Sequence, residues 1–156
     1  MLSTEFGKCL MTFLISMVPV IELRLGLPYG ILAGLELPQA TLCAVLGNML
    51  PVPFIVFFIE AIFRWMREHM PRMDRVVTRM EKKADAKRET IEKYGLFGLV
   101  LLVAIPLPGT GAWTGSLVAA LFGIPPKKAI PCVMLGVCIA AAIMIIVTKL
   151  GIFAFF

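Results

Sequence analysis

Long stretches without charge alternate with short polar segments along this chain of 156 residues. The uncharged runs are Cys9–Ile21, Leu37–Ile59, Tyr94–Pro126 and Ala129–Thr148. Leu37–Ile59 contains 23 residues and Ala129–Thr148 contains 20. Because a helix rises about 1.5 Å per residue, about 20 apolar residues cross a hydrocarbon layer of about 30 Å. These two runs are therefore predicted to form complete transmembrane helices.

The composition supports a membrane protein. Hydrophobic residues make up 60% of the chain, charged residues 16%, and the mean hydropathy is +0.93. Soluble domains average about 45–50% apolar and about 25% charged residues. A soluble protein of this size could not bury so much apolar surface, so we expect one integral membrane domain. The same numbers exclude a disordered chain, a disulfide scaffold and a zinc module.

The charge is concentrated in one segment, Arg64–Lys93. It holds ten of the fifteen lysines and arginines and six of the ten acids, in a chain of net charge +5. A mixed-charge segment beside a transmembrane helix is typical of a cytoplasmic loop under the positive-inside rule, so nucleic acid is not an expected partner. Apolar residues at steps of three and four predict helix, which Pro71 should divide in two. We expect a solvated or interfacial linker.

Cysteine and histidine offer no reactive pattern. Cys9, Cys43, Cys132 and Cys138 lie in apolar segments without a C-x-x-C pair, and His69 is the only histidine. The buried segments contain no Ser/His, Cys/His or metal-ligand set. We therefore expect neither an enzyme nor a metal or cofactor.

The chain matches itself without gaps when shifted by 89 residues. Eight identities fall within the 29 positions from Pro19 to Gly47. The matched pairs are Pro19 and Pro108, Gly26 and Gly115, Leu32 and Leu121, Gly34 and Gly123, Ala40 and Ala129, Cys43 and Cys132, Leu46 and Leu135, and Gly47 and Gly136. Proline and glycine fix backbone shape, so their coincidence indicates a duplication.

Each repeat contains an interruption. Tyr94–Pro126 is too long for one simple span, and its centre, Pro106–Gly111, cannot form regular helix. About a dozen residues remain on each side, enough to reach only the bilayer midplane. The simplest geometry is a re-entrant hairpin of two half-helices. Repeat one matches, with Phe6–Val18, an interruption at Pro19–Pro28, and then Tyr29–Leu35.

The charge distribution favours inverted topology over four ordinary spans. If each repeat crosses the membrane once, Lys127 and Lys128 share a side with the basic linker and Glu36 lies outside, as the positive-inside rule requires. The predicted fold is all-α and integral to the membrane, with inverted repeats that each contain a re-entrant helical hairpin and one full transmembrane helix. The parts are repeat one at 6–63, the cytoplasmic linker helix at 64–93 and repeat two at 94–152.

The first interruption carries Glu22 and Arg24 at the predicted membrane depth. A charge at the centre of a membrane helix costs about 2.5–3.5 kcal/mol on insertion scales. The Pro/Gly setting favours extended backbone, in which side chains two residues apart share a face and can pair. Two interpretations stay open: a salt bridge that staples the turn, or a pair that opens for substrate or proton.

The second interruption is uncharged and rich in glycine and hydroxyl groups. Such a loop can cradle an anion through its N–H groups, or it can simply pack tightly between helices. Trp113 matches Arg24 in the repeat, so the two could stack, although an ordinary core tryptophan explains it as well. The candidate residues for substrate or proton binding are Glu22, Arg24, Pro108, Gly109, Thr110, Gly111, Trp113, Thr114 and Ser116.

Both interruptions carry a family resemblance. P-x-I-E-L-R-x-G-x-P (Pro19 to Pro28) and P-x-P-G-T-G-A-W-T-G-S (Pro106 to Ser116) resemble the signatures of the small multidrug export proteins of prokaryotic membranes. This family is distantly similar to the DedA/VTT superfamily, whose members carry paired re-entrant hairpins and include lipid transporters and scramblases. The resemblance implies a multi-pass protein of the inner membrane.

We therefore expect a secondary transporter for small molecules or drugs in the lipid bilayer, with proton coupling through Glu22 as one option. Two spans make a thin wall, so a homodimer is expected. One alternative is a flippase or scramblase of anionic lipid phosphates, favoured by Arg24 and the half-helix N-termini. Another is a non-transporting membrane assembly or scaffold protein.

Overall fold

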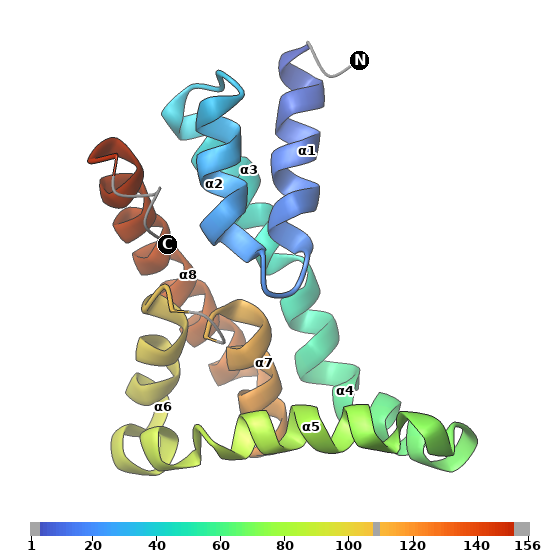
Figure 1. Ribbon diagram of the computed structural model, residues 1–156. Coiled ribbons are helices and arrows are strands. Elements are labelled where there is room, and N and C mark those ends of the chain that lie inside the picture. Colours follow the sequence, from blue (N-terminus) through green and yellow to red (C-terminus); the bar gives the residue numbers. More distant parts are fainter. Residues whose placement is uncertain (1–3, 108–109, 152–156) are drawn as a thin grey trace.

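The computed structural model describes residues 4–107 and 110–151, and every regular element in this part of the chain is a helix (Figure 1). The α-helices are α1 (Glu5–Met17), α2 (Glu22–Leu32), α3 (Leu37–Met49), α4 (Pro51–His69), α5 (Asp74–Asp85), α6 (Arg88–Ala104), α7 (Ala112–Leu121) and α8 (Pro126–Lys149). A short 3₁₀ helix, Pro71–Met73, joins α4 to α5. The all-helical prediction is confirmed.

The two longest apolar stretches match the predicted spans. Helices α3 and α4 form one run, Leu37–His69, and α8 forms the second; both are long and apolar enough to cross a membrane. Leu50, between α3 and α4, keeps helical dihedral angles of −56° and −47°. Pro51 and Pro53 follow it in the first turn of α4, where a missing N–H costs little.

The helices of the two halves follow the 89-residue match. Shifted by 89, α2 covers 111–121, and α7 is Ala112–Leu121. The start of α3 falls on the start of α8. Gly34 and Gly123, just beyond α2 and α7, both have positive φ (87° and 66°), a conformation that glycine adopts at helix C-termini without penalty.

Corresponding helices run in opposite directions. In the view of Figure 1, α1 descends to mid-height, α2 returns upward, and α3 with α4 descends through the whole molecule. In the second half α6 ascends to mid-height, α7 returns downward, and α8 ascends through the whole molecule. The turn between α1 and α2 thus faces the turn between α6 and α7.

Glycines allow close helix contact at equivalent places in the two halves. A Cβ on Gly47 would collide with the Phe13 carbonyl, where α3 meets α1. A Cβ on Gly136 would lie 2.6 Å from Val103 Cβ, where α8 meets α6. Both contacts therefore need a residue without a side chain.

The charged linker folds back onto the helices. Helix α4 ends at His69, just before Pro71, so the predicted division at this proline is confirmed. Helix α5 runs crosswise under the bundle (Figure 1). Val77 and Ala84 on α5 are fully buried, in a cluster with Ile55 and Leu117. The linker helix, expected to be solvated or interfacial, is docked along one face, because its apolar stripe packs against α4 and α7.

The first interruption is shorter than the sequence suggests. The predicted break Pro19–Pro28 is wrong: α1 ends at Met17 and α2 already begins at Glu22, so only four residues, 18–21, lie outside helix. Pro28 lies inside α2, where proline lacks an N–H. The second interruption is confirmed, since 105–107 and 110–111 are outside helix.

Candidate functional site

The two interruptions meet in the middle of the molecule. Trp113, in the first turn of α7, donates its indole N–H to the carbonyl of Met17 at the end of α1, at 3.0 Å. The indole is partly buried, and its N–H bonds to a carbonyl at a helix C-terminus, where the last carbonyls lack partners within the helix. This bond ties the start of α7 to the end of α1.

Glu22 caps the helix of the other half. Its side chain is 4% exposed, and its carboxylate accepts the backbone N–H of Trp113 at 3.1 Å. The residue before α7 is Gly111, which has no side chain to cap the helix itself and has φ of 116°. A Cβ on Gly111 would collide with the Glu22 carboxylate. The glycine thus leaves room for a carboxylate at a helix N-terminus, where a negative charge is stabilised.

The backbone around Glu22 is strained. Val20 has φ of 77° and Glu22 has φ of 48°, in the left-handed region that side chains with a Cβ disfavour. For a β-branched valine this conformation is a clear outlier. Such strain persists only where the surroundings enforce it, and it gathers at binding sites and switch regions.

Arg24 also reaches into the other half. Its guanidinium donates to the carbonyl and to the hydroxyl oxygen of Thr110, each at 2.8 Å. The Thr110 hydroxyl lies 2.6 Å from the carbonyl oxygen of Ile105, which it can reach as a donor. Arg24 therefore holds the turn before α7 rather than standing free.

The predicted pairing of Glu22 with Arg24 is wrong. The Arg24 guanidinium binds Thr110, and the Glu22 carboxylate binds the backbone N–H of Trp113. Among the described residues, the ion pairs within 4.0 Å do not join these two. Of the two interpretations of Trp113, stacking with Arg24 is not formed in this part of the chain, where the cation–π pairs lie elsewhere.

A cavity of about 230 Å³ opens beside these contacts. It is lined by Pro19, Val20, Glu22, Ile55, Ile59, Met80, Lys83, Thr110, Trp113, Thr114 and Leu117. These residues come from both interruptions and from α4, α5 and α7. The wall is mainly apolar, with one carboxylate, one ammonium group and two hydroxyl groups. A small apolar molecule with a single charge fits such a lining.

The structure brings together most of the predicted site residues that it describes. Glu22, Thr110, Trp113 and Thr114 line the cavity, with Gly111 directly behind Glu22. Ser116 lies apart, because its hydroxyl donates to Ala112 O of its own helix at 2.6 Å.

Two predicted site residues, Pro108 and Gly109, lie outside the described residues. Conversely, sequence reasoning missed Lys83 and Met80 of α5. Met80 belongs to the apolar stripe that predicts a packed face, but a lysine in a charged linker carries no signal of its own.

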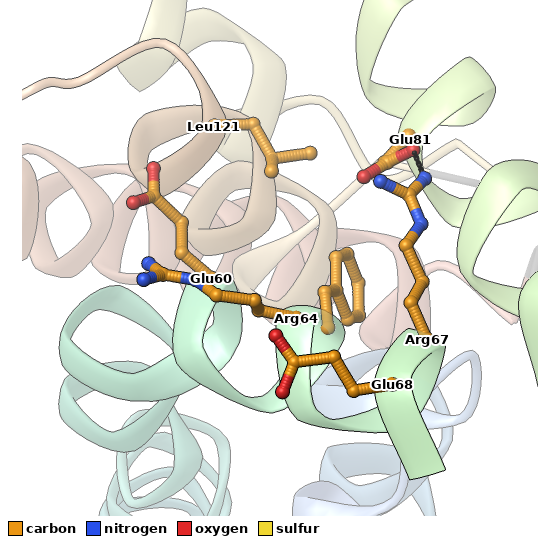
Figure 2. A pocket seen from close by; sticks show the side chains of 7 residues that line it. Glu60, Arg64, Arg67, Glu68, Glu81 and Leu121 are labelled. Carbon is orange, nitrogen blue, oxygen red and sulfur yellow. Dashed lines mark hydrogen bonds and ion pairs between the residues drawn. The ribbon is translucent and has the colours of Figure 1, made fainter. Parts of the chain in front are cut away.

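A second, more polar cavity of about 460 Å³ lies where α4 meets α5. Figure 2 shows Arg67 reaching from α4 to Glu81 of α5, at 2.5 Å. Arg67 also pairs with Asp74 at 3.3 Å. Glu60 and Arg64 line the same cavity. The ion pairs of Arg67 join α4 to α5, and none of these charged residues lines the first cavity.

Metal ligands do not gather at either cavity. Across residues 4–107 and 110–151, the structure contains no group of three His, Cys, Asp or Glu side chains that could hold a metal ion.

Comparison with known proteins gives one finding. No curated protein and no solved structure matches the chain. A family model described as "Putative small multi-drug export protein" matches residues 22–143. The matched span holds Glu22, Arg24, the linker, the second interruption and most of α8, and the family name suggests a transporter rather than an enzyme. The chain belongs to this small multidrug export protein family.

Proposed function

We propose that this protein is a secondary transporter of the prokaryotic inner membrane that exports small molecules through the cavity between its two helix interruptions. The single observation that carries the proposal is the cavity itself, which residues of both halves line around one buried carboxylate, Glu22. Non-helical backbone at membrane depth is tolerated only where protein buries it or where it lines a wet cavity. The non-helical residues Val20 and Thr110 line this cavity, which favours a transport site here.

The proposed topology is an inverted repeat of re-entrant hairpins. Helices α1 (13 residues), α2 (11 residues) and α7 (10 residues) are each about 20 Å long or less, too short to cross a hydrocarbon layer of about 30 Å. The opposite directions of corresponding helices support one crossing per repeat. So does the contact between Glu22 and Gly111, because these positions match in the repeat and equivalent residues meet near a two-fold axis.

The ends of the spans support a cytoplasmic linker. Helix α8 begins beside Lys127 and Lys128 at the end of the molecule where α5 lies, whereas α3 begins after Glu36 at the other end (Figure 1). The positive-inside rule then places residues 64–93 in the cytoplasm. Single cysteines at Lys127 and Glu36, in a variant without the four native cysteines, should react with an impermeant maleimide from opposite sides. Labelling from one common side would contradict the topology.

Glu22 is the proposed coupling residue. As a carboxylate it caps α7; when it takes up a proton, it loses the charge that the α7 N-terminus stabilises. The cap then weakens, and the strained backbone of Val20 and Glu22 can relax. Exchange of a proton for a cationic substrate at this carboxylate would link transport to the proton gradient.

The contacts favour a small-molecule transporter over a flippase of anionic lipid phosphates. A lipid phosphate would be expected to bind Arg24 and the N–H groups at the start of α7. Arg24 already binds Thr110, and Glu22 already occupies the α7 N-terminus. A bound phosphate would have to displace a carboxylate of the same sign.

Purified protein in liposomes tests the proposal. We expect the wild type to move a cationic dye when a pH gradient is imposed, and Glu22→Gln to abolish this movement while the protein stays folded. Glutamine keeps an acceptor oxygen for Trp113, so it removes the charge more than the contact. Glu68→Gln, an exposed acid of α4 outside the cavity, is the matched control and should transport normally.

The other outcomes of this assay separate the alternatives. Movement of a polyprenyl phosphate without dye movement would instead support the flippase. No movement of either by well-folded protein would support an assembly or scaffold protein. Because two complete spans enclose little volume, we also propose a homodimer, which the mass of the detergent-solubilised protein would test.

A further inference from the structure

The crosswise helix α5 contributes a charge to the candidate transport site. Lys83 lines the same cavity as Glu22, although the two residues are 61 positions apart in the chain. Three residues earlier, Met80 lines it as well. Residues three apart share a helix face, so α5 presents one apolar and one basic side chain to the cavity.

The position of α5 is fixed on both sides of Lys83. Val77 and Ala84 are fully buried, and Phe63 and Leu117 belong to the same apolar cluster. Because Val77 and Ala84 lie two turns apart on one face, they set the rotation of α5 about its axis. The ion pairs of Arg67 with Asp74 and Glu81 hold the helix from its other flank.

Lys83 and Glu22 are the two opposite charges of this cavity. Both side chains line it, the carboxylate from the start of α2 and the ammonium group from α5. The ion pairs within 4.0 Å that the described residues form do not include Lys83. Arg24 is fixed on Thr110, but a lysine has a flexible four-carbon stem and can withdraw from the cavity. Only one of the two cations near Glu22 is therefore held in place.

We propose that Lys83 is a tethered counter-ion of Glu22 that determines which charged molecules enter the site. This inference rests on the proposed transport function. In the empty cavity the ammonium group balances the carboxylate. An apolar molecule with one positive charge takes its place beside Glu22, and Lys83 swings outward. The site thus selects lipophilic monovalent cations that can compete with the Lys83 amine. The same competition weakens their binding enough for release.

Equilibrium binding of ethidium to the purified full-length protein in detergent tests this role. Lys83→Gln removes the competing charge but keeps a polar side chain of similar reach. Because this substitution removes a cation that competes with ethidium for the carboxylate, we expect ethidium to bind on the order of tenfold more tightly. Lys83→Arg should bind like the wild type.

Lys82→Gln is the matched control. Lys82 is the neighbouring exposed lysine and lines a different hollow on the outer side of α5, with Arg75 and Arg79. Lys82→Gln removes the same net charge from the same helix as Lys83→Gln does, so it reports any general electrostatic effect on binding. We expect its affinity for ethidium to stay within about twofold of the wild type, as for a screened surface charge. Nile red, an uncharged dye, should bind all variants equally.

The possible results separate this inference from the proposed function. If the wild type transports ethidium and Glu22→Gln abolishes transport, but Lys83→Gln binds no more tightly than Lys82→Gln, the role of Lys83 is wrong and the transport function stands. Tighter binding of Nile red by Lys83→Gln would also contradict it, because a steric effect would then explain the change. If the wild type neither binds nor transports ethidium, both proposals fail.

Discussion

The two helix interruptions are built from matching positions but from different chemistry. Glu22 at the start of α2 matches Gly111 just before α7, and Arg24 matches Trp113. The start of α2 extends a carboxylate and a guanidinium to the start of α7, where a backbone N–H and the carbonyl and hydroxyl of Thr110 bind them. Each half therefore provides the hydrogen-bond partners of the other, and neither half alone would satisfy these polar groups.

The halves also differ in how deeply they are buried. Eight of the ten residues of α7 are buried, whereas six of the eleven residues of its counterpart α2 are buried. Helix α7 lies among α4, α5, α6 and α8, while α2 contacts mainly α1, α3 and α8. The matching half-helices thus occupy a central and a peripheral place. Substitutions at matched positions should therefore have unequal effects.

The largest expected effect on the free energy of unfolding is that of a substitution at Gly111. Gly111→Ala places a Cβ against the Glu22 carboxylate and forces alanine to adopt φ of 116°. We expect the free energy of unfolding to fall by about 2–4 kcal/mol, the sum of backbone strain and steric overlap. Unfolding by SDS titration in mixed micelles measures this loss.

Gly123→Ala is the control for Gly111→Ala. Gly123 also has positive φ, but a Cβ there meets nothing within 4 Å, so its substitution reports backbone strain alone, about 1 kcal/mol. Adding Glu22→Ala to Gly111→Ala should recover the steric part of the loss. Equal losses at Gly111 and Gly123 would show that the glycine does not make room for the carboxylate.

The sequence predicted the helices better than it predicted the interruptions. Apolar runs and prolines identify both long spans, the break after α6 and the turn at Pro71, because these features are local. The start of α2 at Glu22 depends on contacts with α7, 91 residues away, so local propensity placed the break too far along the chain. The sequence did not identify Lys83 as a site residue for the same reason, since only the docking of α5 brings it to the cavity.

A smaller difference in the free energy of unfolding is expected between substitutions at Gly47 and Gly136, where the long helices contact the half-helices. Gly47→Ala would press a Cβ onto the backbone of Phe13, whereas Gly136→Ala meets mainly the side chain of Val103. Backbone yields less than a side chain does, so we expect losses of about 2–3 kcal/mol at Gly47 and about 1–2 kcal/mol at Gly136. The same SDS titration compares them. A larger loss at Gly136 would indicate that the central position of α6 and α8 outweighs the closer contact of α1 with α3.

The smallest effect is expected at the end of α4, which continues into the linker. Arg67 joins α4 to α5 through Asp74 and Glu81, but its side chain is 45% exposed, and exposed ion pairs contribute only about 0.2–1 kcal/mol. Arg67→Ala should therefore lower the free energy of unfolding by less than about 1 kcal/mol, and less still at high salt. Arg64→Ala is the control, since Arg64 lies one turn earlier on α4 and lines the same polar cavity between α4 and α5. It should change the free energy of unfolding by less.

Because Val77 and Ala84 keep α5 docked, ethidium binding should be unaffected by Arg67→Ala. A clear loss of binding would mean that the ion pairs, and not the apolar stripe, hold Lys83 at the cavity.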